Sequence, residues 1–101
     1  MTTSTPAHRD HPITDYEAIM TADAQLIDVR EPDEVEAGSL PGARNIPLGD
    51  IAQRRSEIDP DRAVVVFCRA GGRSTQAAEL LTDSGYRDVT NLAGGMLAFE
   101  N

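Results

Sequence analysis

Short apolar runs separated by longer polar stretches recur along the 101-residue chain. Two of them, residues 25–29 (QLIDV) and 62–67 (RAVVVF), are compact, and the second is rich in β-branched side chains. An apolar run of this length predicts a buried strand and is typical of parallel strands covered on both faces. We expect two further strands, around residues 43–46 and at residues 88–92.

Helical spacing is clearest in residues 73–85, where Ala77, Leu80 and Leu81 fall on one face. Gly85 closes this segment, and a glycine just past the last periodic residue commonly ends a helix. The segment is therefore predicted to be an amphipathic helix.

Shorter helices are expected elsewhere. Thr14 and Glu17 have the spacing of a capping box, so a helix should begin there. Residues 31–38 place Pro32 near a first helical turn, follow it with acidic side chains and reach Gly38 as a stop. Weaker helical patterns occur in residues 49–58 and 94–100.

The alternation of strands with helices predicts an α/β fold with a mostly parallel sheet. Residues 1–11 are polar and lack periodicity, which predicts a flexible N-terminal tail, and residues 12–101 then form a single domain. His8 and His11 stand at the end of that tail. Metal binding by this pair is one interpretation. A solvated tail is favoured, because no further ligands cluster nearby, and no metal site is predicted.

Composition and charge exclude several classes of protein. Hydrophobic residues make up 40% of the chain and charged residues 26%, as in soluble globular proteins. No apolar run approaches the roughly 20 residues of a membrane span, and no signal-peptide pattern is present, so we expect no membrane partner. One cysteine forms no internal disulfide, and we expect a cytoplasmic location.

The net charge is −8, from seventeen acidic and nine basic residues, which argues against nucleic acid as a partner. All nine basic residues are arginine. The absence of lysine excludes Schiff-base chemistry, the lysine-dependent phosphate loop and lysine general bases.

The single cysteine, Cys68, stands where the strongest predicted strand ends and a helix is about to begin. Gly71 and Gly72 let successive backbone N–H groups turn toward one centre, and Arg69 and Arg73 add positive charge. Such a field holds an anion and favours thiolate over thiol. A lone cysteine is alternatively a small buried hydrophobe, and a glycine pair a simple turn. The cysteine and the glycine pair occur together with two arginines and a helix start, and this combination favours a thiolate nucleophile in an anion-binding loop.

Residues 68–74 (CRAGGRS), called the cysteine loop below, resemble the Cys-x-x-Gly-x-Arg-Ser loop of rhodanese sulfurtransferases. Residues 26–48 and 91–100 resemble the first and the closing signatures of that family, in the correct order. The resemblance covers about residues 12–100.

The resemblance implies a rhodanese-like fold of five mostly parallel strands with helices on both faces. It implies that Cys68 is the catalytic residue, which takes sulfane sulfur from thiosulfate or a similar anion as a persulfide. A thiol or cyanide acceptor then removes that sulfur, and a protein acceptor is a further expectation. No cofactor is implied. The substrate-binding residues would be Arg69, Ala70, Gly71, Gly72 and Arg73.

Two alternatives stay open. One is a sulfur carrier or interaction module that hands persulfide sulfur to a dedicated protein partner. The other is a small cysteine-dependent phosphatase or arsenate reductase. Four residues separate Cys68 from Arg73, one fewer than is typical of such phosphatases, which favours sulfur transfer.

Five residues in or near the motifs need separate interpretation. Asp28 and Arg30 either line the pocket or form an ion pair that fixes the loops, and the ion pair is favoured. Ser74 either contacts substrate or serves the helix start, and the helix start is favoured. Ser39 stands where the family commonly has histidine. Phe99 stands where the family commonly has tryptophan, and neither of these two residues belongs to the cysteine loop.

Overall fold

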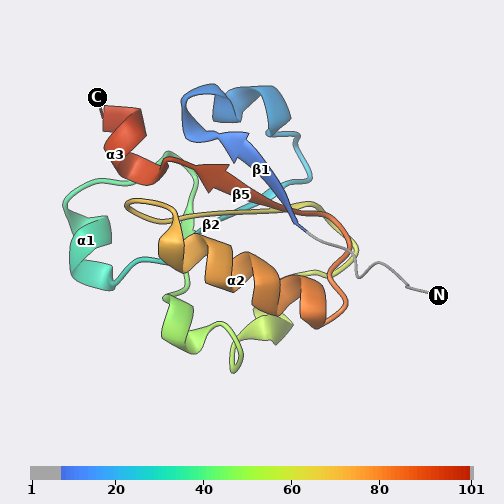
Figure 1. Cartoon of the computed structure of the whole chain (residues 1–101). Coiled ribbons are helices and arrows are strands. Elements are labelled where there is room, and N and C mark those ends of the chain that lie inside the picture. Colours follow the sequence, from blue (N-terminus) through green and yellow to red (C-terminus); the bar gives the residue numbers. More distant parts are fainter. Residues whose placement is uncertain (1–7, 101) are drawn as a thin grey trace.

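A five-stranded, parallel sheet forms the centre of the protein in a computed structural model, which describes residues 8–100 (Figure 1). The spatial order of the strands is β1-β5-β4-β2-β3. The predicted α/β class with a mostly parallel sheet is confirmed. The strands are β1 (Arg9–Pro12), β2 (Gln25–Asp28), β3 (Arg44–Asn45), β4 (Val64–Phe67) and β5 (Val89–Ala93).

Helices cover both faces of the sheet, as predicted. The α-helices are α1 (Pro32–Glu36), α2 (Gly72–Asp83) and α3 (Gly95–Glu100), and the 3-10 helices are η1 (Ile13–Ile19), η2 (Leu48–Asp50) and η3 (Arg55–Glu57). Gly85, just past α2, has a φ of +97°, a left-handed conformation that glycine adopts without strain. No helix among residues 8–100 is long and apolar enough to cross a membrane.

The side chains of β4 explain why its sequence is an unbroken apolar run. Val64 and Val66 belong to one core cluster, and Val65 and Phe67 belong to another. Successive side chains of a strand point to opposite faces, so a strand between two covered faces needs apolar residues at every position. On the first face the cluster includes Ala77, Ala78 and Leu81 of α2, and on the second it includes Ile13 of η1 and Met96 of α3.

The expectation of a flexible tail over residues 1–11 is wrong for residues 9–11. These residues form most of β1, where Arg9 is in register with Thr90 of β5. Residues 1–7 of the predicted tail lie outside the described residues. An edge strand with three of its four residues exposed is held by backbone hydrogen bonds and needs no apolar pattern, so periodicity does not reveal it.

The two histidines are also not part of a solvated tail. His8 lies 3.3 Å from the Asp10 carboxylate, and His11 lies 3.5 Å from the Asp15 carboxylate. Within residues 8–100, no three side chains of the kinds that ligate metals are grouped closely enough to hold an ion.

Two predicted helices differ in detail from the structure. Residues 49–58 form no continuous helix, only η2, a turn and η3, although Ile51 and Ile58 are fully buried. The Ile58 N–H donates to the Arg55 carbonyl in η3, a 3-10 rather than an α-helical bond, and the Tyr86 hydroxyl also donates toward the carbonyls of Arg55 and Ile58. The capping box predicted at Thr14 is absent, because η1 begins one residue earlier, after Pro12.

Candidate active site

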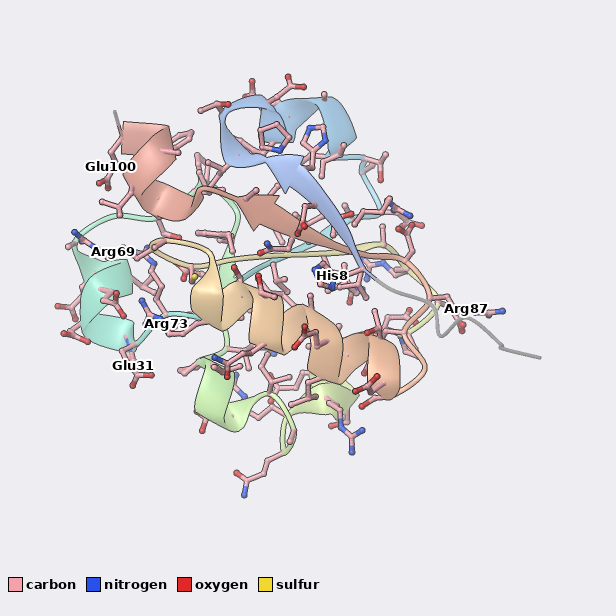
Figure 2. The ribbon with its side chains drawn as sticks, viewed as in Figure 1. His8, Glu31, Arg69, Arg73, Arg87 and Glu100 are labelled. Carbon is pink, nitrogen blue, oxygen red and sulfur yellow. The ribbon has the colours of Figure 1, made fainter. Side chains whose placement is uncertain are left out.

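The cysteine loop lies at the carboxyl edge of the sheet, as predicted. Cys68 directly follows β4, and α2 begins at Gly72. Figure 2 shows Arg69 and Arg73 at the same end of the molecule as Glu31 and Glu100. Functional groups gather at this edge in parallel sheets, because strand ends and helix starts meet there.

Three donors point at the sulfur of Cys68. The Gly71 N–H lies 3.0 Å from Sγ, and the N–H and hydroxyl of Ser74 each lie 3.4 Å from it. Gly71 has a φ of +110°, which a residue with a side chain rarely adopts, and this conformation turns the loop back over the thiol. Cys68 is only 1% exposed, so the loop replaces water around its sulfur.

These contacts change the acidity of the thiol. Burial raises the pKa of Cys68, because it penalises the charged form. Hydrogen bonds from the Ser74 hydroxyl and from the N–H groups of Ser74, Gly71 and Ala70 lower the pKa and outweigh burial. The net pKa of Cys68 therefore lies below its ordinary value, the direction predicted from the sequence.

Ser74 serves both the helix start and the sulfur. Its hydroxyl lies 3.2 Å from the Gly71 carbonyl oxygen as well as 3.4 Å from Sγ. The same carbonyl accepts hydrogen bonds from the Thr75 N–H and hydroxyl, at 3.0 and 2.7 Å. Because Thr75 satisfies the Gly71 carbonyl by itself, the Ser74 proton is free to turn toward a thiolate.

Arg73 does not stand alone beside the thiol. Its two terminal nitrogens donate to both carboxylate oxygens of Glu34 in α1, at 2.6 and 3.0 Å. The hydrogen bond from Arg73 lowers the pKa of Glu34 to about 2 and raises the pKa of Arg73. The thiolate of Cys68 contributes to the raised pKa of Arg73, so these two groups lie within electrostatic reach. The sequence does not predict Glu34 as a site residue, because it lies 39 positions from Arg73.

Arg69 is exposed at the rim of the loop. It lines a small pocket of about 250 Å³. Within residues 8–100, the side chain of Arg69 forms no ion pair. The other residues that line this pocket are Arg30, Glu34, Ala37, Gly38, Met96 and Glu100.

Asp28 and Arg30 form the predicted ion pair under the neighbouring loop. The Arg30 Nη2 lies 2.8 Å from Asp28 Oδ2, and Arg30 also donates to the Gly38 carbonyl at 2.6 Å. Ser39 donates to Asp28 Oδ2 at 2.8 Å, so the residue that departs from the family pattern still holds this carboxylate. Both members of the pair are buried, which supports a role in fixing the loop.

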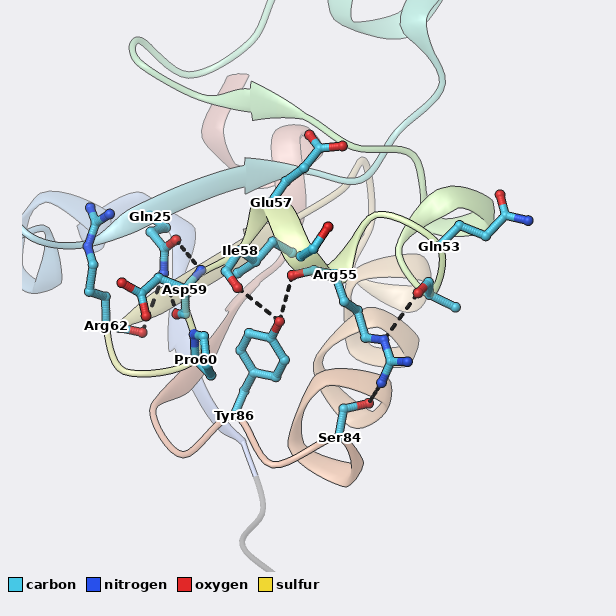
Figure 3. A pocket seen from close by; sticks show the side chains of 12 residues that line it. Gln25, Gln53, Arg55, Glu57, Ile58, Asp59, Pro60, Arg62, Ser84 and Tyr86 are labelled. Atoms are coloured by element: carbon cyan, nitrogen blue, oxygen red, sulfur yellow. Dashed lines mark hydrogen bonds between the residues drawn. The ribbon is translucent and has the colours of Figure 1, made fainter.

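A larger hollow, about 810 Å³, lies near Gln25 at the start of β2 (Figure 3). Its polar side chains bond mostly to protein groups around it: Gln25 contacts the backbone of Asp59, and Arg55 donates to Ser84. No residue of the cysteine loop lines it. We therefore assign the candidate active site to the cysteine loop.

Comparison with known proteins agrees with the fold. The family description "Rhodanese-like domain" matches residues 13–101. The chain belongs to the rhodanese-like domain family.

Relatives of this rhodanese-like domain include proteins of several lengths. It is 50% identical over 72 residues to the uncharacterized protein YqhL of Bacillus subtilis, which covers 71% of this chain and 57% of YqhL. A protein of Allochromatium vinosum named sulfurtransferase is 46% identical over 79 residues, covering 78% of this chain and 74% of that protein.

A solved structure shows the same fold. Reduced CoADR-RHD of Bacillus anthracis superposes with a TM-score of 0.83 at 33% identity, over 90% of this chain and 16% of that one. The rhodanese-like domain thus spans little more than half of YqhL and a small part of the Bacillus anthracis protein.

Proposed function

We propose that the chain is a sulfurtransferase that carries sulfane sulfur as a persulfide on Cys68. The observation that supports this most directly is the set of donors, from Gly71 and Ser74, that meet at Sγ. Donors fixed around a buried sulfur stabilise its anionic form without needing water. The sulfurtransferase name of the Allochromatium vinosum relative supports the same chemistry.

In the proposed reaction, the Cys68 thiolate attacks the outer sulfur of thiosulfate or a similar donor. A new S–S bond forms at Sγ, the donor's own bond to that sulfur breaks, and sulfite leaves with the electron pair. The acceptor, a thiol or cyanide, then attacks the outer sulfur and returns Cys68 as thiolate. Arg69 and the loop N–H groups would hold the anionic end of the donor.

A protein thiol as the acceptor and a cytoplasmic location remain parts of this proposal. The exposure of Arg69 at the rim supports access by a partner. Repeated turnover of small donor and acceptor would identify a free enzyme, whereas a single loading step would identify a carrier.

The test is intact-mass measurement after incubation with thiosulfate. We expect the protein to gain one sulfur atom and cyanide to remove it. Cys68→Ser should gain none. The matched control is Cys68→Ser combined with Ser56→Cys, which places the only thiol on an exposed residue outside the loop. Sulfur gain by Cys68→Ser, or equal gain by the control, would show that the loop is not the site.

A further inference from the structure

Two of the three arginines at the cysteine loop are already held by carboxylates. Arg30 forms an ion pair with Asp28. The two terminal nitrogens of Arg73 donate to the two carboxylate oxygens of Glu34. Within residues 8–100, only Arg69 of these three forms no ion pair. A donor that approaches Cys68 therefore meets one uncompensated cation, Arg69, rather than the two, Arg69 and Arg73, expected from the sequence.

Glu34 is fixed in this role by two separate contacts. Its Oε1 accepts the Glu31 N–H at 3.0 Å at the start of α1, and the same carboxylate accepts both terminal nitrogens of Arg73. With a pKa of about 2, Glu34 is ionised throughout the pH range in which thiols react. Its negative charge consequently stays beside Arg73.

Further carboxylates lie around the same mouth. Glu100 lines the small pocket that Arg69 also lines, and Figure 2 shows Glu31 at this end of the molecule. Glu34 and Glu100 both raise the pKa of Arg30, so their charges reach into this region. A donor that approaches Cys68 meets about as much negative as positive charge.

We propose that Glu34 is a specificity-determining residue, which disfavours sulfur donors with two negative charges and leaves the loop suited to donors with one. The inference rests on the proposed function, because it concerns the donor of the same reaction. A thiosulfonate, R–SO₂–S⁻, is such a donor. Thiolate attack on its outer sulfur breaks the S–S bond, and the sulfinate R–SO₂⁻ leaves with the electron pair.

Thiosulfate and methanethiosulfonate are matched probes. They share the sulfonyl-bound outer sulfur, and a methyl group in the second replaces one charged oxygen of the first. In Glu34→Gln, the ratio of kcat/KM for thiosulfate to kcat/KM for methanethiosulfonate should rise about tenfold, because one charge at a partly exposed site is removed. We expect the change mainly in KM for thiosulfate.

Two further variants separate local charge from general effects. Glu36→Gln removes one exposed charge from the same helix without touching Arg73, and it should leave the ratio unchanged. Glu34→Asp keeps the charge and should keep the wild-type ratio. A thermal melt of each variant checks that the fold is retained.

Binding to Cys68→Ser protein, measured by calorimetry with and without Glu34→Gln, tests the inference without turnover. Glu34→Gln should tighten thiosulfate binding more than methanethiosulfonate binding, because the repulsion that is removed scales with the charge of the ligand. An equal loss for both donors, or an unchanged ratio, would overturn the role of Glu34. Absence of a Cys68 persulfide with either donor in the unmodified protein would instead overturn the proposed function, and the binding ratio would still decide the role of Glu34.

Discussion

The backbone N–H of Met96 donates a 2.9 Å hydrogen bond to the carbonyl oxygen of Cys68. The next residue, Leu97, donates in the same way to the carbonyl of Arg69, also at 2.9 Å. The first turn of α3 thus anchors the start of the cysteine loop through backbone hydrogen bonds. These contacts satisfy two loop carbonyls, while the loop N–H groups remain free to face the sulfur.

Gly95 makes this close approach of α3 and the loop feasible. A Cβ atom at Gly95 would lie 2.3 Å from the Arg69 carbonyl oxygen, and the residue has a φ of +60°. Gly95→Ala should therefore lower the free energy of unfolding by at least about 2 kcal/mol and impair sulfur transfer. Urea unfolding and thiosulfate:cyanide assays measure both effects.

The control for this prediction is Gly49→Ala. A Cβ atom there meets nothing within 4 Å. We expect a change below about 0.5 kcal/mol. An equal loss of unfolding free energy in both variants would contradict the prediction that the close approach of Gly95 to the loop is needed for stability.

Ser74→Ala should raise the pKa of Cys68. The Ser74 hydroxyl is the largest of the contributions that lower this pKa, and removing a donor to the thiolate favours the protonated form. The ultraviolet absorbance of the thiolate, followed against pH, should have a midpoint at higher pH than in the unmodified protein. Thr82→Ala, which removes a hydroxyl bonded to Glu79 in the same helix, should leave the midpoint in place. A midpoint that moves equally in both variants contradicts this role of Ser74.

The pair of Glu34 and Arg73 should make stability depend on acid pH. The folded-state pKa of Glu34 is lowered from 4.5 to about 2, so the stabilisation is present above pH 4.5 and is lost as the pH falls toward 2. Because both side chains are partly exposed, we expect about 1 kcal/mol. Urea unfolding of the unmodified protein and Glu34→Gln should differ at pH 7 and converge toward pH 2. A difference that stays constant over this range would contradict the ionic origin.

The spacing between Cys68 and Arg73 should exclude phosphate esters. We expect measurable thiosulfate:cyanide transfer and negligible hydrolysis of an aryl phosphate. A glycine inserted after Gly71 would displace Ser74 by up to ~3.8 Å, and it should impair transfer, because Ser74 donates to the sulfur. A glycine inserted after Asp61, in an exposed turn, is the control. Robust phosphatase turnover that depends on Cys68 would favour the phosphatase alternative.

Several features could be predicted from the sequence because they depend on neighbours along the chain. The apolar run of β4 indicates a strand buried on both faces, since side-chain direction alternates from residue to residue. The position of Cys68 between a strand end and a helix start follows from local patterns as well. The α/β class follows from the alternation of such segments.

Other features depend on side chains and strands that meet only after folding. Residues 9–12 carry no strand pattern and become β1 only because β5 offers an open edge. Residues 49–58 follow a helical pattern, yet they form separate turns, and Tyr86, about thirty positions further on, donates to carbonyls at the end of this segment.

The sequence by itself determined the fold class and the position of the only thiol, because both follow from local periodicity and turn chemistry. The tertiary structure decided the electrostatics around that thiol. Arg73 looks like a free cation beside Cys68 in the sequence, but α1 brings Glu34 against it from 39 positions away. The charge at a site is the sum over all elements packed there, and that sum exists only once the chain has folded.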